Sequence, residues 1–144
     1  MIRTERLQLI TVQDLEQINL LLSQLTAKPY PLELLTAKHI AASSFWIVAR
    51  DGEVEGQPIV GMASLIKNRH PAGYSGLLED VVVLDSYRRR GIAEELWRVI
   101  VKTARGEGMK HIDFTCKPSR AAAHAFYDKM GCERRDTVPR RLNL

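Results

Sequence analysis

The chain has 144 residues, of which 45% are hydrophobic and 26% charged. This composition predicts a single globular domain, residues 1–144, with its own core. It contains no apolar run long enough to cross a membrane and no signal-peptide core, so we expect a cytoplasmic protein. The net charge of +4 fits a protein that binds either nucleic acid or a small polyanion.

The first half of the chain predicts a strand followed by two helices. Residues 1–10 alternate partly and indicate the strand, and Thr11 and Asp14 are suited to cap the helix after it. The apolar residues of that helix recur at helical spacing: Leu15, Ile18, Leu21, Leu22 and Leu25. The segment KPYP, residues 28–31, interrupts the helix, and a second one is expected over about residues 32–42.

A β-hairpin is predicted next. Residues 44–50, SFWIVAR, and residues 58–66, PIVGMASLI, indicate two strands joined by the turn DGEVEGQ. Residues 67–76, KNRHPAGYSG, predict a polar loop. Residues 77–84, LLEDVVVL, alternate little and indicate a central strand that is covered on both faces.

The second half continues with alternating helices and strands. An apolar stripe predicts a helix from Ile92 that ends at Gly106 and Gly108. HIDFTC, residues 111–116, indicates a strand, and residues 118–130 a helix with Pro118 in its first turn and Gly131 beyond its end. Residues 132–136 and 140–144 are expected to form a last pair of short strands. The fold class is therefore α/β (α+β), with a mixed sheet and helices on both faces.

The turn YRRRG joins the central strand to the helix that follows it. The first N–H groups of a helix have no intrahelical acceptor and lie at the positive end of the helix dipole. Gly91 lets a phosphate approach the backbone, Ala93 keeps the next position small, and three arginines add forked donors. The turn therefore predicts a pyrophosphate site made by the amides of residues 88–93. The alternative is an ordinary surface turn that carries three arginines.

The segment VVVLDSYRRRGIAEEL resembles the signature of the GNAT superfamily of acyl-CoA-dependent N-acetyltransferases, with Arg88, Gly91 and Ala93 in the signature positions. SRAAAHAFYDKMGC is similar to the late helix of that family and supplies Phe126 and Tyr127. The resemblance covers residues 77–131. It implies a mostly antiparallel sheet with one parallel strand pair, acetyl-CoA as co-substrate, a primary amine acceptor and a homodimer. Ser119 and Arg120 stand where the family often has Asn at the second position.

The resemblance also implies the residues that bind the co-substrate. The diphosphate would meet the turn and the start of its helix: Arg88, Arg89, Arg90, Gly91, Ile92, Ala93 and Glu94. The pantetheine arm would run beside the strand at Val81, Val82 and Val83, and further contacts would come from Ser119 and Arg120. The spacing of Cys116 and Cys132 does not match a metal site, and no metal is predicted.

Acetyl transfer to an amine needs a base, an oxyanion donor and an acid for the leaving thiolate. The resemblance implies that Tyr127 is the acid, since a phenol keeps its proton at neutral pH. Glu79 is the predicted base, acting directly or through an ordered water, and a desolvated carboxylate would have a raised pKa. Strand alternation places Glu79 on the face of Val81 and Val83, and Asp80 on the opposite face. Glu79 and Asp80 are both candidates for binding the amine, and the alternative is that they are structural.

Two other functions stay open at this point. One is a non-catalytic sensor of acyl-CoA, and the other is a basic protein that binds nucleic acid, although no recognition helix or aromatic stacking platform is evident. We expect neither a nucleic-acid nor a membrane partner. LLEDVVVLDSYRRRG particularly resembles the glucosamine-6-phosphate N-acetyltransferase branch, so an amino-sugar phosphate is one candidate acceptor. Polyamines, amino acids, aminoglycosides and protein N-termini are the others.

Overall fold

The computed structural model describes residues 1–26 and 31–144, which form two compact units, residues 1–114 and 115–144. The predicted interruption at residues 28–31 lies almost entirely outside the described residues. Within the described ranges, no helix is long and apolar enough to span a membrane. The prediction of a single domain stays a prediction.

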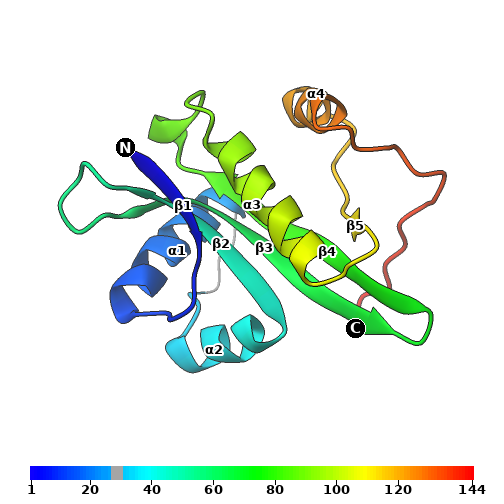
Figure 1. Cartoon of the computed structure of the whole chain (residues 1–144), viewed down its shortest axis with the longest axis horizontal. Coiled ribbons are helices and arrows are strands. Elements are labelled where there is room, and N and C mark those ends of the chain that lie inside the picture. The colour runs from blue at the N-terminus through cyan, green and yellow to red at the C-terminus, as the bar shows by residue number, and fades with distance from the viewer. Residues whose placement is uncertain (27–30) are drawn as a thin grey trace. The chain divides into compact units, whose positions relative to one another are not determined.

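The first unit contains the sheet and three helices, with these bounds: β1 (Ile2–Arg6), α1 (Val12–Leu25), α2 (Leu34–Ala42), β2 (Ser44–Asp51), β3 (Ile59–His70), β4 (Gly73–Val83), a short 3-10 helix η1 (Asp85–Tyr87), α3 (Ile92–Gly106) and β5 (Ile112–Asp113). The second unit contains α4 (Ala121–Lys129). The five strands lie in the order β1-β2-β3-β4-β5 (Figure 1). The pairs from β1 to β4 are antiparallel and β4 pairs with β5 in parallel, which confirms the predicted mixed sheet.

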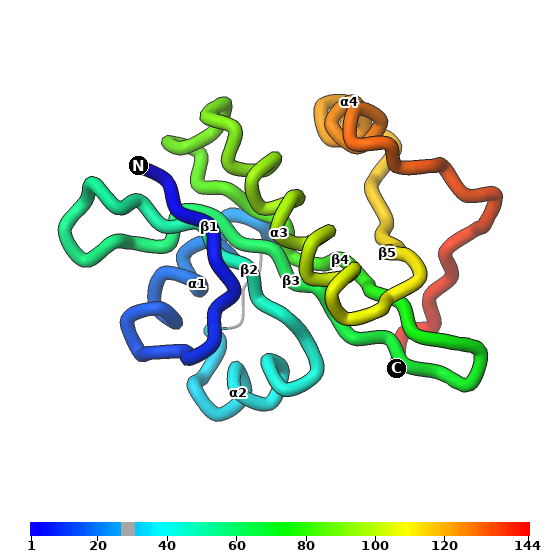
Figure 2. Tube along the Cα trace, viewed as in Figure 1, coloured from blue at the N-terminus to red at the C-terminus, as the bar shows by residue number. Residues whose placement is uncertain are grey.

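Helices cover both faces of the sheet in the first unit. On one face, Ile92, Leu96 and Ile100 of α3 pack against side chains such as Ile47 and Leu65. On the other face, α1 and α2 pack against a second core cluster that includes Trp46, Val48 and Met62. Figure 2 traces the backbone through the strands of the sheet and the helices that cover it. Because β2 and β3 are buried from both sides, their sequences are apolar with little alternation.

The start of α1 is held by a network of polar groups. Thr11 and Asp14 form the predicted cap, with each side chain bonded to the backbone N–H of the other residue. Arg50 Nη2 of β2 donates to Asp14 Oδ1 at 2.7 Å. Burial opposes ionisation of Asp14, but the hydrogen bonds from Arg50 and Thr11 prevail and lower its pKa. The network fixes α1 to β2.

The prediction of a polar loop over residues 67–76 is wrong. β3 continues to His70 and β4 begins at Gly73, so the strands form a hairpin with a tight turn. Cross-strand contacts stabilise it: Arg69 lies 3.8 Å from the ring centroid of Tyr74, and Asn68 Nδ2 donates to Ser75 Oγ at 3.1 Å. Polar residues can extend a strand in this way when each pairs with a partner across the ladder.

The end of the chain also differs from the prediction. The strand expected over residues 111–116 is only β5, Ile112–Asp113, and Pro118 precedes α4 rather than lying in its first turn. Residues 132–144 form no strand. From residue 133 onward every side chain is exposed, so this segment has no apolar face with which to cover a sheet edge.

Candidate active site

A β-bulge interrupts β4 in the middle of the LLEDVVVL segment. Met62 and Ser64 of β3 are two residues apart, yet their partners Val82 and Glu79 on β4 are three apart. The extra residue lies at Asp80 and Val81, and Asp80 has a left-handed φ of 53°. A non-glycine residue in this conformation is uncommon, and such positions concentrate at functional sites.

The bulge makes the predicted alternation of Glu79 and Asp80 wrong. Leu78 and Val81 pack into the same core cluster against α3, although simple alternation would place them on opposite faces. Glu79 pairs with Ser64 and therefore shares the face of Met62, toward α1 and α2, rather than the face of Val81 and Val83. The extra residue resets the pattern, and no feature of the local sequence marks where it occurs.

The two carboxylates differ in their surroundings. Both residues are exposed at the surface. The surrounding protein nevertheless desolvates the Asp80 carboxylate and raises its pKa. A raised pKa suits a general base, the role predicted for Glu79.

One edge of β4 is open beside the bulge. Among the described residues, β5 pairs with β4 at Gly76 and Leu77, so residues 78–83 have β3 on one edge and no strand on the other. The Leu84 N–H donates to Val60 of β3 at 2.9 Å, and alternation directs the backbone of Val82 toward β3 as well. The backbone of Val83 points the other way. Of the predicted pantetheine contacts, Val82 is thus turned away from the open edge, and its side chain is buried.

The predicted anion site lies where β4 leads into α3. Gly91 is the N-cap of α3 with φ of 76°, and no side chain caps the helix. A Cβ placed on Gly91 would have nothing within 4 Å, so the space in front of the helix N-terminus is open. The Arg88 N–H, however, donates to Asp85 C=O at 3.3 Å, so the prediction of an unpaired amide is wrong for residue 88. The amides available to an anion belong to the residues after it.

The three arginines of the turn have different roles. Arg88 pairs with Asp85 at 2.7 Å, and the guanidinium of Arg90 lies 4.7 Å from the ring centroid of Tyr87. Arg89 has φ of 63° and no ion-pair partner among the described residues, which leaves its charge available. Farther along α3, Arg98 pairs with Glu94 at 3.2 Å.

Two side chains from elsewhere in the first unit, those of Asp51 and Gln24, hold the turn in place. Tyr87 donates its hydroxyl to Asp51 Oδ2 at the end of β2, at 2.8 Å. On the opposite face, Gln24 of α1 donates from Nε2 to Val83 C=O at 2.8 Å and accepts from the Asp85 N–H at 2.9 Å. These two hydrogen bonds, here called the Gln24 clamp, hold the backbone where the chain leaves β4. Sequence reasoning missed it, because a glutamine near a helix end has no distinguishing signal.

The second unit contains Ser119, Arg120 and Tyr127. Tyr127 lies on α4, and Arg120 is the N-cap of that helix. Burial raises the pKa of Tyr127, and the nearby Cys116 acts in the same direction, so the phenol keeps its proton well into the alkaline range. Phe126 packs against Tyr127 with ring centroids 5.5 Å apart. The turn after α4 is closed by Gly131, whose φ is 83°.

The bulged strand, its open edge and the glycine N-cap of α3 all lie within a segment that matches a known protein family. The model of the acetyltransferase (GNAT) family matches residues 12–132. The chain belongs to the acetyltransferase (GNAT) family. It is thus an N-acetyltransferase-family enzyme, and enzymes of this family use acetyl-CoA.

Solved structures share the fold over nearly the whole chain. An acetyltransferase from Trypanosoma brucei is 26% identical with a TM-score of 0.81, covering 100% of both chains. Glucosamine-6-phosphate N-acetyltransferase from Arabidopsis thaliana is 16% identical with a TM-score of 0.80, covering 99% of this chain and 98% of its own. An aminoglycoside N-acetyltransferase in complex with CoA is 18% identical with a TM-score of 0.75, covering 100% and 99%. A search of curated protein sequences found no match.

Proposed function

We propose that this GNAT enzyme transfers the acetyl group of acetyl-CoA to a primary amine by direct attack in a ternary complex. The observation that carries the proposal is the open N-terminus of α3, where Gly91 has a left-handed φ and free space in front of it. This site directly follows the open edge of β4. An extended chain that ends in a diphosphate would match the two features in that order.

In this proposal, backbone amides after Arg88 and the charge of Arg89 hold the diphosphate. Arg88, Arg90 and the first turn of α3, including Ile92, Ala93 and Glu94, complete the phosphate site. The backbone groups of Val81 and Val83 form hydrogen bonds with the pantetheine, and the N–H of one of these residues donates to the oxyanion. Ser119 and Arg120 supply further contacts from the second unit.

The chemistry forms a C–N bond and breaks the C–S bond of the thioester. A base removes a proton from the amine, and Tyr127 donates its proton to the departing sulfur. Glu79, acting directly or through an ordered water, is the base predicted from the sequence, and the raised pKa of Asp80 makes Asp80 the alternative base. The variants Glu79→Gln and Asp80→Asn distinguish the two, because loss of the base lowers kcat, whereas loss of an amine contact raises KM.

The test is a thiol-release assay with acetyl-CoA against a panel of amines that includes amino sugars, their phosphates, polyamines, amino acids and aminoglycosides. We expect amine-dependent release that follows the amount of acetylated product. CoA binding without transfer to any amine would favour the acyl-CoA sensor instead. Nucleic-acid binding with a steep salt dependence and no CoA binding would contradict the proposal altogether.

A homodimer and an amino-sugar phosphate acceptor are the finer parts of the proposal. The similarity to glucosamine-6-phosphate N-acetyltransferase supports the fold at 16% identity, and the acceptor rests on the resemblance of the Glu79–Asp80 strand. Light scattering tests the dimer, and kcat/KM compared between glucosamine 6-phosphate and glucosamine tests the acceptor.

A further inference from the structure

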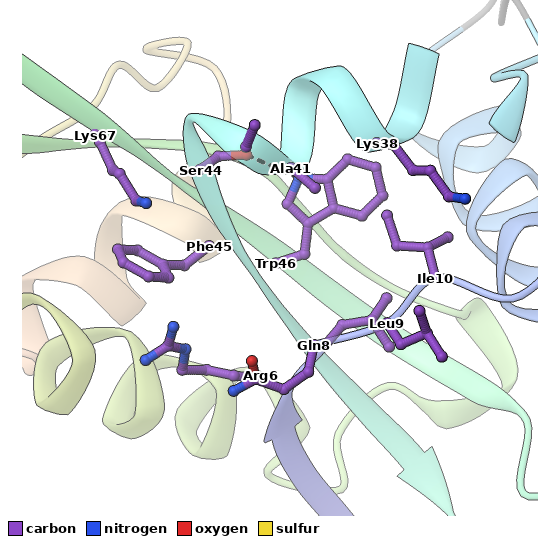
Figure 3. Close-up of a pocket in the computed structure, with 12 residues that line it drawn as sticks. Arg6, Gln8, Leu9, Ile10, Lys38, Ala41, Ser44, Phe45, Trp46 and Lys67 are labelled. Carbon is purple, nitrogen blue, oxygen red and sulfur yellow. Dashed lines mark hydrogen bonds between the residues drawn. The ribbon is translucent and has the colours of Figure 1, made fainter. Parts of the chain in front are cut away.

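A second cationic region lies on the first unit, in a hollow of about 380 Å³ (Figure 3). It is lined by the end of β1 and the segment that follows it, by α2, by the first residues of β2, and by Lys67 in the second half of β3. The open end of β4 pairs with Gly61, whereas this hollow reaches Lys67 near the other end of β3. None of its lining residues belongs to the α3 site.

The lining is positively charged without a compensating carboxylate. Arg6, Lys38 and Lys67 contribute three cations, and the lining residues include no Asp or Glu. Within the part of the chain that the structure describes, none of these cations has an ion-pair partner. Elsewhere the same strands do pair their charges, as Arg50 does with Glu5 at 2.9 Å.

The charges of Arg6 and Lys67 converge on one aromatic ring. The Arg6 guanidinium lies 4.3 Å and the Lys67 ammonium 4.6 Å from the ring centroid of Phe45. Figure 3 shows the two side chains reaching the ring from opposite sides. Phe45 is buried, and cation–π contacts with its ring hold the positive charges of Arg6 and Lys67 beside it. An anion bound beside the ring would offset their charge, which no carboxylate of the lining compensates.

The rest of the hollow is mostly apolar, and the polar groups of Trp46 and Ser44 are bonded to each other and to α2. Trp46 and Ile10 are buried and form part of the wall. The Trp46 indole N–H donates to Ser44 Oγ at 3.0 Å, and that hydroxyl donates to Ile40 C=O at 2.8 Å. These bonds fix the wall, and the cations are the charged donors that line the hollow.

We propose that this hollow binds a small organic anion, with a phosphate or carboxylate group held by Arg6 and Lys67 beside Phe45, while Lys38 and Trp46 line the other end of the hollow. It would be a binding site separate from the coenzyme site.

The test uses phenyl phosphate and benzoate as anionic probes and benzylamine as the cationic control. Each is titrated into a Trp97→Phe background, because the chain has two tryptophans and this change leaves Trp46 as the reporter. Each titration is done without CoA and again with saturating CoA, which occupies the α3 site. We expect one of the anions to change Trp46 fluorescence saturably and benzylamine to have no effect.

Charge-neutral variants locate the binding. Arg6→Gln and Lys67→Gln should each weaken the anion by about threefold and together by about tenfold, as expected for partly exposed charges, and Lys38→Gln, at the other end of the hollow, should have a smaller effect. Lys102→Gln, at an exposed lysine of α3, should change nothing, and Arg6→Lys should retain most of the affinity. Thermal unfolding of each variant checks that the fold is kept.

The proposal is overturned if neither anion binds at millimolar concentration, or if the double variant of Arg6 and Lys67 binds as well as the parent. Binding that CoA abolishes would also overturn it, since the probe would then occupy the α3 site. Binding of benzoate alone or phenyl phosphate alone supports the site and identifies its acid group.

Discussion

The α3 N-terminus and the hollow at Arg6, Lys38 and Lys67 are both cationic, but they are built differently. At α3 the proposed donors are backbone amides beside a glycine with φ of 76°, and the arginine side chains of the turn add charge. In the hollow, the donors are side chains from separate elements that meet at Phe45. A backbone site needs a particular conformation at one position, whereas a side-chain site needs distant segments brought together. The two sites should therefore respond differently to substitution.

The largest effect is expected from Gly91→Asp. Asp and Asn tolerate a left-handed φ about equally, so Gly91→Asn is the matched control for conformation and size. The added carboxylate would occupy the open space before the helix and repel the diphosphate, weakening CoA by more than about 100-fold. Isothermal titration of CoA measures this loss. Affinity within a few-fold of the Asn variant would contradict the α3 assignment, and the hollow should still bind its anion in both variants.

Tyr127→Phe should separate chemistry from binding. Removing a general acid costs about 100-fold in kcat, while the Kd for CoA should stay near that of the parent. In the parent, the alkaline decline of kcat should come as the pH rises through the Tyr127 pKa, which is above its ordinary value of 10.0, because the acid must be protonated to act. The pH profile of the Phe variant should lack this alkaline decline. Unchanged kcat in the variant would remove Tyr127 from the mechanism.

Gln24→Glu tests whether α1 positions the coenzyme site. The substitution keeps an acceptor for the Asp85 N–H but replaces the donor that bonds Val83 C=O with a second acceptor. Loss of one such bond is worth about 1 kcal/mol, so CoA should bind about fivefold more weakly. Gln13→Glu, at an exposed position on the same helix, is the charge-matched control. An effect equal to that of the control would mean that the clamp does not support the site.

The smallest effect is expected from Asp80→Asn, and it is a gain in stability. Asn tolerates the left-handed φ of 53°, and it removes a carboxylate whose ionised form is desolvated. The folded-state pKa of Asp80 is raised, so ionisation destabilises the parent as the pH rises above 3.8. The variant should match the parent in acid and exceed it by about 0.5 kcal/mol at neutral pH.

Urea unfolding at several pH values measures this difference. A variant that is less stable at neutral pH would show that the ionised carboxylate has a stabilising partner. If Asp80 is the base, the same variant should also lose most of its turnover, which would link the stability gain to the cost of a desolvated catalytic group.

Local sequence by itself determined the helices of the first unit and the glycine turn that precedes α3. Helical stripes, the cap at Thr11 and Asp14, and the turn from Arg88 to Gly91 depend on residues within a few positions of one another, and the structure contains them. Tertiary structure alone decided the bulge at Asp80, the extended β3–β4 hairpin and the clamp by Gln24. Strand register and side-chain partners depend on contacts between segments far apart in the chain. For the same reason, the grouping of Arg6, Lys38 and Lys67 around one hollow could be found only after the chain had folded.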